Sequence, residues 1–411
     1  MALIVPTERQ SNDESSNVPM VAATSDDGLL PTDVLRDILL RLPIKPLCRL
    51  HAVCRSWRSL LSDSSFIAAH DARQQPLVAV CTQEPWPILG YMVKAEDVHI
   101  QDTSGQLVRQ MGVENCTPGN NSNVACTNLD LLCVEGADMR LRVLDPATGV
   151  VSLLPDVINV DGDGERYEYG RYFTMYVVGR NDSTGETKVL AIVREYGADS
   201  CCKVLTLGDA RGWRETGMPP THVYLISQYT AHVKGVLFFV GSQGIAAYDL
   251  EKDTWRTDLL QLALPKPINY LGSLFLAELS DSLVACYHGN DQEDQTCPND
   301  ASMDLWILTD SDKVIWSKQC TITMPQQAST NPGDLTSLHP LWSLDDGRIV
   351  FWVWKRYGPE TVEFIQVYDP ATRTHTDGIQ IPTGYTFHAV YKGSLLRSTI
   401  DMKLRMYPVT V

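Results

Sequence analysis

The hydrophobic periodicity of this chain changes once, near residue 76, and that change restricts the fold more than any other feature. Between residues 29 and 73, apolar residues recur every three or four positions, which is the spacing of an amphipathic helix. After residue 76, short apolar runs alternate with Gly, Pro, Asp and Asn turns, and no long amphipathic helix follows. The sequence therefore predicts an α+β protein with separate parts, a small helical unit and then an all-β unit.

The helical segment contains two apolar stripes separated by prolines. The first comprises Val34, Leu35, Ile38, Leu39 and Leu42. The second comprises Leu50, Val53, Cys54, Trp57, Leu60 and Leu61, and Phe66 and Ile67 follow a Ser/Asp break. Pro31 suits a first helical turn, and Asp33 favours the positive end of the helix dipole. Pro43 ends that helix and Pro46 can open the next, so two or three short helices are predicted.

The small size of this segment raises the question of what covers its apolar residues. A unit of about 45 residues cannot bury enough apolar surface to be stable alone without a disulfide or a metal. Some of its leucines must pack between the helices, and the others need a second surface. That surface is either the β unit or another protein, and the residues alone leave both alternatives open.

An internal repeat selects among the possible all-β folds. Residues 141–148 (LRVLDPAT) match residues 365–372 (IQVYDPAT), and weaker copies lie at 204–213, 245–250 and 305–316. In the clear copies an alternating strand ends in an aspartate that can cap the chain reversal. The strand ends are spaced about 42 to 62 residues apart, as in propellers with four-stranded blades. The sequence therefore predicts a six- to seven-bladed β-propeller.

Composition and charge argue against several classes of protein. The formal net charge is −16, whereas phosphate binding requires a cationic surface, so we expect no nucleic-acid partner. The apolar run at residues 2–5 is too short for a secretory signal, and no stretch approaches the ~20 apolar residues of a membrane span. The 11 cysteines include no CxxC pair, which favours a reducing compartment, cytoplasmic or nuclear. Residues 1–28, rich in Ser, Asn, Asp and Thr, are expected to form a disordered tail.

No pattern of catalytic or metal-binding residues stands out. The sequence has no Walker A, G-x-G-x-x-G or G-x-S-x-G motif, and its nine histidines lack metal-ligand spacing. The acidic turn at residues 161–165 lacks the glycine and the closing glutamate of a calcium loop. We therefore predict no catalytic, cofactor-binding or metal-binding residues. The polar connections at residues 155–170, 289–302 and 325–335 are either binding surface or tolerated insertions, and the sequence favours neither.

Read in order, the apolar positions of the helical segment resemble the F-box, in the version found in plants. The family pattern is matched by Leu30-Pro31, Asp33, Val34-Leu35, Ile38-Leu39, Leu42-Pro43, Leu47, Leu50, Val53-Cys54-Arg55-Ser56-Trp57-Arg58 and Leu60-Leu61. Asp33 stands where the family often has Glu, a departure that removes no apolar contact.

The β unit has a family resemblance of its own, to the F-box-associated, kelch-like domain of plant F-box proteins. The resemblance is carried, in this order, by residues 141–146, 232–239, 305–308 and 391–395. It divides the chain into a tail at 1–28, an F-box at 29–73 and a target-binding domain at 76–411.

The resemblance implies a non-catalytic adaptor of an SCF ubiquitin ligase, with a role in protein degradation. The F-box would dock on a SKP-family adaptor that bridges to a cullin and a RING subunit, and the β domain would bind an unknown target protein. The implied adaptor-binding residues are Leu30, Pro31, Leu35, Ile38, Leu39, Leu42, Pro43, Leu47, Leu50, Val53, Cys54, Trp57, Leu60 and Leu61. The segment 29–73 has seven Lys or Arg and four Asp, hence +3, and the total of −16 leaves −19 for the rest. This positive charge suits an acidic adaptor surface, although a merely solvated helical face would show it too.

Two alternatives to the ligase adaptor stay open. In the first, the propeller is an enzyme or binds a glycan or small molecule, and the F-box is an accessory. The sequence offers no convergent acid, base, nucleophile or metal set for an enzyme, but lectin-like binding remains compatible with it. In the second, the F-box protein acts as a scaffold outside SCF.

Overall fold

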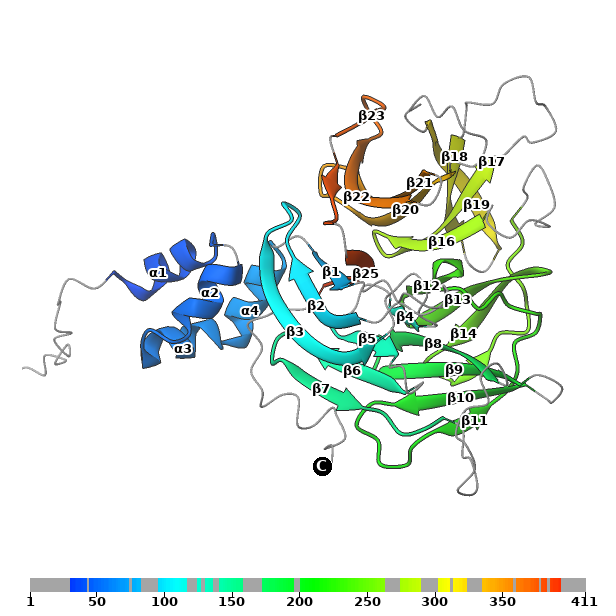
Figure 1. Ribbon diagram of the computed structural model, residues 1–411, viewed down its shortest axis with the longest axis horizontal. Coiled ribbons are helices and arrows are strands. Elements are labelled where there is room, and N and C mark those ends of the chain that lie inside the picture. Colours follow the sequence, from blue (N-terminus) through cyan, green and yellow to red (C-terminus); the bar gives the residue numbers. More distant parts are fainter. Residues whose placement is uncertain are drawn as a thin grey trace, which may run out of the picture.

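The computed structural model describes the chain from Leu30 to Lys392, with gaps (Figure 1). The described residues are 30–42, 44–73, 76–82, 95–116, 124–126, 130–135, 140–157, 172–195, 200–262, 274–289, 302–310, 313–323, 335–357, 360–376, 378–382 and 385–392. The tail expected at 1–28 and most of the polar connections lie outside them. Helices come first and strands follow, so the predicted fold class is confirmed.

Four short helices form the N-terminal unit. They are α1 (Thr32–Leu39), α2 (Ile44–Leu50), α3 (Arg55–Leu61) and α4 (Ser64–Asp71). The second predicted stripe is not one helix, because Cys54 is extended (φ −155°, ψ 170°) and serves as the N-cap of α3. At the start of α4, Asp63 Oδ1 accepts the backbone N–H groups of Ser65 and Phe66, each at 3.0 Å. The sequence marks this second boundary with a capping residue, whereas neither Pro nor Gly marks the break at Cys54.

Within the described residues the strands form six sheets, the blades of a six-bladed β-propeller. The first blade comprises β25 (Tyr385–Tyr391), β1 (Leu77–Thr82), β2 (Ala95–Gln101) and β3 (Leu107–Cys116). The second comprises β5 (Leu132–Glu135), β6 (Leu141–Asp145) and β7 (Val150–Leu153). The third comprises β8 (Tyr172–Arg180), β9 (Thr187–Glu195), β10 (Cys201–Thr206) and β11 (Arg214–Thr216). The fourth blade comprises β12 (Thr230–Val233), β13 (Val236–Gly241), β14 (Gly244–Asp249) and β15 (Thr254–Trp255), and the short helix η2 (Ser227–Tyr229) precedes it. The fifth comprises β16 (Leu274–Leu279), β17 (Ser282–Gly289), β18 (Ser302–Asp310) and β19 (Ile315–Thr323). The sixth comprises β20 (Leu335–Ser343), β21 (Ile349–Tyr357), β22 (Glu360–Asp369), β23 (Thr374–His375) and β24 (Ile379–Gln380).

The two ends of the propeller sequence meet in the first blade. β25, the last strand among the described residues, lies at the edge of this sheet and pairs antiparallel with β1, with Leu77 opposite Tyr391. The ring is therefore closed by hydrogen bonds between the first and last strands, and its closure needs both ends of the propeller sequence.

One apolar run of the sequence divides between two blades. Residues 124–134 have the composition of a single strand, but β4 (Val124–Cys126) pairs in parallel with β8 of the third blade. β5 pairs instead with β6 of the second blade. Asp130 begins a bend before β5. Strand pairing is a long-range property, so the run alone could not reveal it.

In every blade, an aspartate caps a turn between two neighbouring strands: β2–β3, β6–β7, β10–β11, β14–β15, β18–β19 and β22–β23. In each turn the carboxylate accepts a backbone N–H from two or three residues later, at 2.8–3.0 Å. The six residues are Asp102, Asp145, Asp209, Asp249, Asp310 and Asp369. The capping role expected of Asp145 and Asp369 is therefore confirmed, and the first blade adds Asp102, which the repeat did not reveal.

The same six turns explain why glycines are scarce in the repeat. Among the described residues, each turn contains at least one residue with a left-handed backbone, at φ between 52° and 84°. These residues are Gly105, Gly149, Gly208, Gly212, Asp253, Val314 and Arg373. Three blades thus use a residue with a side chain where glycine is favoured, which costs ~1–2 kcal/mol at each position. These three blades therefore keep the backbone geometry of the turn without the glycine that would mark it in the sequence.

Replacing Asp145 by alanine is expected to lower the free energy of unfolding by about 1–2 kcal/mol. The residue is 3% exposed and accepts the Ala147 N–H and the Thr148 hydroxyl, both at 2.8 Å. Both donors would lose their partner inside the protein. Chemical denaturation measures the loss, and Asp369→Ala, at a more exposed turn, should lower stability less. A wild-type unfolding midpoint for Asp145→Ala would contradict the capping role.

The tryptophans of the sixth blade belong to its core. Trp342 and Trp352 are each 4% exposed. The Trp352 ring is stacked with His339 at 4.9 Å and with Phe387 at 5.0 Å, and its Nε1 donates to Glu363 at 2.9 Å. These contacts leave no open face on Trp352 for a ligand to stack upon.

Two buried histidines are expected to make the fold sensitive to acid. Phe275 packs edge-on against His288 and His339, and burial lowers the pKa of His288 to about 4 and that of His339 to about 3. Because both folded pKa values lie below the ordinary value of ~6.5, the unfolded chain binds more protons in between. Stability is therefore full above pH ~6.5 and is lost as pH falls toward 4, by about 2 kcal/mol for each histidine between pH 7 and pH 5.

Denaturation at pH 7, 6 and 5 checks this dependence. His339→Gln, which keeps a hydrogen-bonding side chain beside Ser337 but does not titrate, should flatten it. An equally steep loss of stability in this variant would show that other groups are responsible.

Candidate functional site

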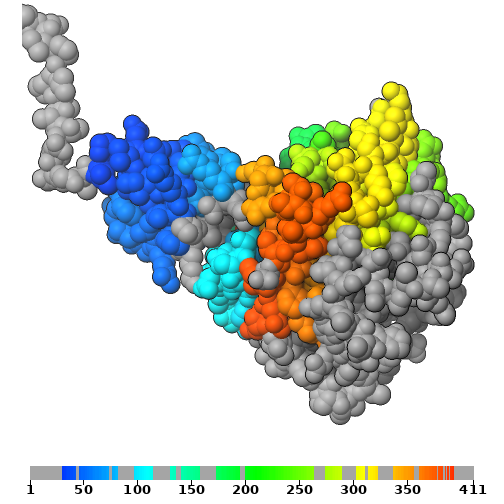
Figure 2. Space-filling view, turned by 90° about the horizontal axis from the view of Figure 1, so that it is seen from above, coloured from blue at the N-terminus to red at the C-terminus, as the bar shows by residue number. Residues whose placement is uncertain are grey.

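The helical unit packs its inner face against the first blade of the propeller. Five helical side chains are at most 5% exposed, and they form one apolar cluster with strands β1, β2, β3, β5, β6 and β25. They are Leu39, Leu40, Leu47, Leu61 and Phe66. Figure 2 shows the helices (blue) at one side of the propeller, next to its first strands (cyan). Part of the apolar stripe is thus covered by the β unit, one of the two alternatives that the sequence left open.

The outer face of the same unit leaves four large apolar side chains in solvent. Leu30 is 56% exposed, Val34 and Ile38 are each 44% exposed, and Val53 is 61% exposed. Val34 and Ile38 lie one turn apart on the same side of α1, and Leu30 directly precedes Pro31, the N-cap of this helix. A row of exposed apolar residues on a folded unit indicates a surface for another protein.

The predicted docking residues fall into three groups. Leu30, Pro31, Ile38, Val53 and Cys54 are exposed. Leu35, Leu42, Leu50, Trp57 and Leu60 are half-buried. Leu39, Leu47 and Leu61 are buried, and Pro43 lies outside the described residues.

The buried group has no surface to offer a partner in this conformation, so any docking contact rests on the other two groups. Val34 is exposed but was absent from the predicted set. Its spacing of four from both Leu30 and Ile38 was the signal that could have included it.

Polar contacts hold α1 and α4 together beneath this row. The Arg36 guanidinium donates to the Ser65 hydroxyl at 3.2 Å, lies 3.9 Å from the Asp63 carboxylate, and covers the Phe66 ring at 5.6 Å. His70 is fully buried, and its Nε2 lies 3.1 Å from the Leu42 carbonyl oxygen. These contacts tie the last turn of α1 and the residues that follow it to α4, so the exposed row is presented on a fixed support.

Exposed arginines outnumber exposed aspartates on the helical unit. Arg41, Arg49, Arg55, Arg58 and Arg73 are all exposed in the helical unit. Against a propeller of strongly negative net charge, these arginines make the helical unit the positive pole of the molecule. Such a surface favours an acidic partner and would raise the association rate more than the affinity.

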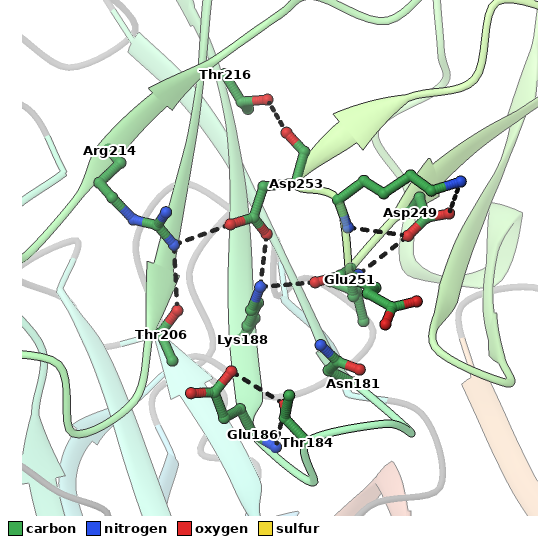
Figure 3. Close-up of polar contacts among 12 residues, drawn as sticks. Asn181, Thr184, Glu186, Lys188, Thr206, Arg214, Thr216, Asp249, Glu251 and Asp253 are labelled. Carbon is green, nitrogen blue, oxygen red and sulfur yellow. Dashed lines mark hydrogen bonds and ion pairs between the residues drawn. The ribbon is translucent and has the colours of Figure 1, made fainter.

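The most concentrated polar cluster of the propeller joins its third and fourth blades (Figure 3). The buried Lys188 ammonium donates to the Leu250 carbonyl at 2.6 Å and to Asp253 Oδ1 at 2.8 Å. Arg214 donates to Asp253 Oδ2 at 3.0 Å, and the Thr216 hydroxyl donates to the Asp253 carbonyl at 2.9 Å. Lys188 and Arg214 bind both carboxylate oxygens of Asp253, so this cluster holds the two blades together and leaves neither oxygen available to a ligand.

The described residues show no constellation for a metal or for membrane insertion. No group of three or more His, Cys, Asp or Glu side chains among them could hold a metal ion. No helix in this part of the chain is long and apolar enough to cross a bilayer.

The sequence of both units matches known families over the regions just described. Residues 99–382 match the family described as F-box associated beta propeller domain, and residues 29–68 match the F-box domain. The chain belongs to the F-box-associated β-propeller family. The four-helix unit is its F-box, and the resemblance to plant F-box proteins is confirmed.

Similar proteins from a plant are named as F-box proteins. The F-box/kelch-repeat protein At3g23880 of Arabidopsis thaliana is 24% identical over 347 residues, which cover 78% of this chain and 84% of that protein. The F-box protein At3g49450 of the same plant is 24% identical over 294 residues, covering 65% and 70%. An F-box implies a SKP-type adaptor as partner, and an F-box followed by a propeller fits a family of substrate adaptors.

Proposed function

We propose that this F-box protein is the non-catalytic, substrate-recognition subunit of an SCF ubiquitin ligase. The F-box docks on a SKP-family adaptor, and through it on a cullin and a RING subunit. The propeller binds the target protein and holds its lysines near the ubiquitin-charged enzyme, which raises their effective concentration. We place this complex in the cytoplasm or the nucleus.

The observation that carries this proposal is the exposed row on α1. Leu30, Val34 and Ile38 remain in solvent although the helices around them are packed against the propeller. A folded protein gains nothing by exposing a continuous apolar row unless a partner covers it. Apolar side chains at intervals of four residues suit the groove of an adaptor.

The topology supports one face of the propeller as the target-binding side. The F-box enters β1 at Leu77, where the register places Val78 opposite Gln101, beside the Asp102 turn. The connections between successive blades lie at the other ends of the strands, away from this entry point. We assign the target to the face that carries those connections.

A described part of that face has the composition of a binding surface. Met218 and Ile226, in the connection between β11 and β12, are 45% and 43% exposed, and Phe173 at the start of β8 is 42% exposed. Phe173 pairs with Arg194, which donates to the Val223 carbonyl at 2.5 Å. These contacts support a shared apolar surface over the third and fourth blades.

Coexpression of the full chain with a SKP-family adaptor, followed by gel filtration, tests the proposal. A one-to-one complex that recruits a cullin–RING pair would support it. A soluble, folded chain that elutes without the adaptor would overturn it and would bring forward the glycan- or small-molecule-binding alternative.

A further inference from the structure

We propose that the closing strand β25 and the F-box helices form one cooperative unit, so that opening the ring also unfolds the F-box. A change that destabilises the ring closure would then destabilise the F-box as well. The first part of this inference concerns the chain alone. Its consequence for adaptor affinity rests on the function proposed above.

The first observation is a common core. One apolar cluster contains Leu47 and Phe66 from the helices, Ala79 from β1, and Ala389 and Tyr391 from β25. All five side chains are at most 2% exposed. Removing β25 would therefore open to solvent the same core that covers the inner face of the F-box.

The second observation is the position of β1 between the two modules. α4 ends at Asp71 and β1 begins at Leu77, so only five residues of the chain separate the F-box helices from β1. β1 is paired directly with β25, with Ala79 opposite Ala389. No other strand lies between the F-box connection and the closing strand.

The third observation is that β1 and β25 each face two cores. Ala79 and Ala389 point into the cluster shared with the F-box. Their neighbours Val78 and Val390 point into a second cluster, with Trp352 of the sixth blade. Loss of β25 thus exposes both clusters at once, which makes a stepwise opening unfavourable.

The F-box cannot hold itself together when this core opens. A helical unit of about 45 residues buries too little apolar surface to be stable alone. A terminal strand is also where local unfolding is expected to begin. Opening of β25 is therefore expected to release the F-box.

A reciprocal effect of the adaptor follows by linkage. If the F-box is folded only when the ring is closed, an adaptor that binds the folded F-box must also stabilise the closure. The ring and the docking surface then influence each other through equilibrium, with no contact between adaptor and β25.

Hydrogen–deuterium exchange on the full chain tests the cooperative unit. Tyr391→Ala, in β25, should raise the exchange rates of amides in α1–α4 and β1 by tenfold or more. The matched control is Tyr248→Ala, which removes an equally buried tyrosine from β14 in the fourth blade. It should raise exchange locally and leave the F-box amides protected.

Two results would overturn the inference: F-box amides that keep their protection in Tyr391→Ala, or an equal loss in both variants. If Tyr391→Ala does not fold, Tyr391→Leu provides a milder change with the same expected pattern.

Adding a SKP-family adaptor separates this inference from the proposed function. A bound adaptor should slow exchange in β25, and unchanged β25 exchange in a stable complex would overturn the coupling. Failure of the wild-type chain to bind the adaptor would count against the proposed function, while the exchange pattern of the two tyrosine variants would still decide the inference.

Discussion

Replacing Val34 and Ile38 together by aspartate is expected to abolish adaptor binding while leaving thermal unfolding nearly unchanged. Both side chains are 44% exposed and lie one turn apart on α1, so neither contributes much to the core. Buried anchors in an interface typically contribute ~2 kcal/mol or more each, which for two corresponds to a loss of about three orders of magnitude in affinity. The added negative charges would also repel an acidic adaptor surface.

Gel filtration and calorimetry with a SKP-family adaptor measure this effect. Ile315→Asp is a matched control, because this side chain on β19 is 47% exposed and lies on the propeller. It should bind the adaptor like the wild type. Tight binding by the double variant would place the docking surface elsewhere on the F-box, among the half-buried residues such as Trp57.

A Trp57→Ala variant would test docking less cleanly than the Val34 and Ile38 double variant. Trp57 is half-buried and packs against the core shared with the first blade. Its replacement by alanine would remove both a candidate docking contact and a part of the core. A loss of binding in Trp57→Ala could therefore follow from either cause, whereas the exposed row separates them.

Replacing Asp253 by alanine is expected to lower the free energy of unfolding by about 3–5 kcal/mol. The Lys188 side chain is 6% exposed and would remain as a buried ammonium with only the Leu250 carbonyl as a partner. The bond from Arg214 would be lost as well, but it contributes less because that side chain is 34% exposed. The contact between the third and fourth blades would weaken at its most polar point.

Two further variants identify the cause of this loss in chemical denaturation. Asp253 has a left-handed backbone (φ 52°), which asparagine tolerates and alanine does not, so Asp253→Asn isolates the effect of the charge. Lys188→Met combined with Asp253→Ala should recover part of the stability, because the buried charge is then gone. If the double variant is less stable than Asp253→Ala alone, the unpaired ammonium is not the cause.

Patterns among residues close together in the sequence were sufficient to predict that the first part is helical and the second is all-β. The change of period near residue 76 separated helices from strands, because side chains on a helix and on a strand recur at different intervals. Asp145 and Asp369 marked repeated turns, since a short carboxylate can accept the N–H groups that a chain reversal frees. These features depend on residues close together in the chain, and for that reason they could be read from it.

The sequence alone could not show which apolar residues of the F-box are buried and which are exposed. Leu39 and Ile38 are adjacent leucine and isoleucine residues of one stripe, yet the first is 1% exposed and the second 44%. Both have the composition of a contact residue. Which of them faces the propeller depends on where the first blade stands, and the blade is built from strands at both ends of the propeller.

The order of apolar positions and the aspartate turns thus determined the F-box, the β-propeller class and the family by sequence alone. Only the tertiary structure decided that there are six blades, that β4 pairs with β8, and that Lys188 meets Asp253 across a blade boundary. It also decided which apolar side chains of the F-box remain outside the core. The physical reason is the range of the interactions: turns and helix stripes are formed by near neighbours, whereas ring closure, strand exchange and burial join residues that the chain separates widely.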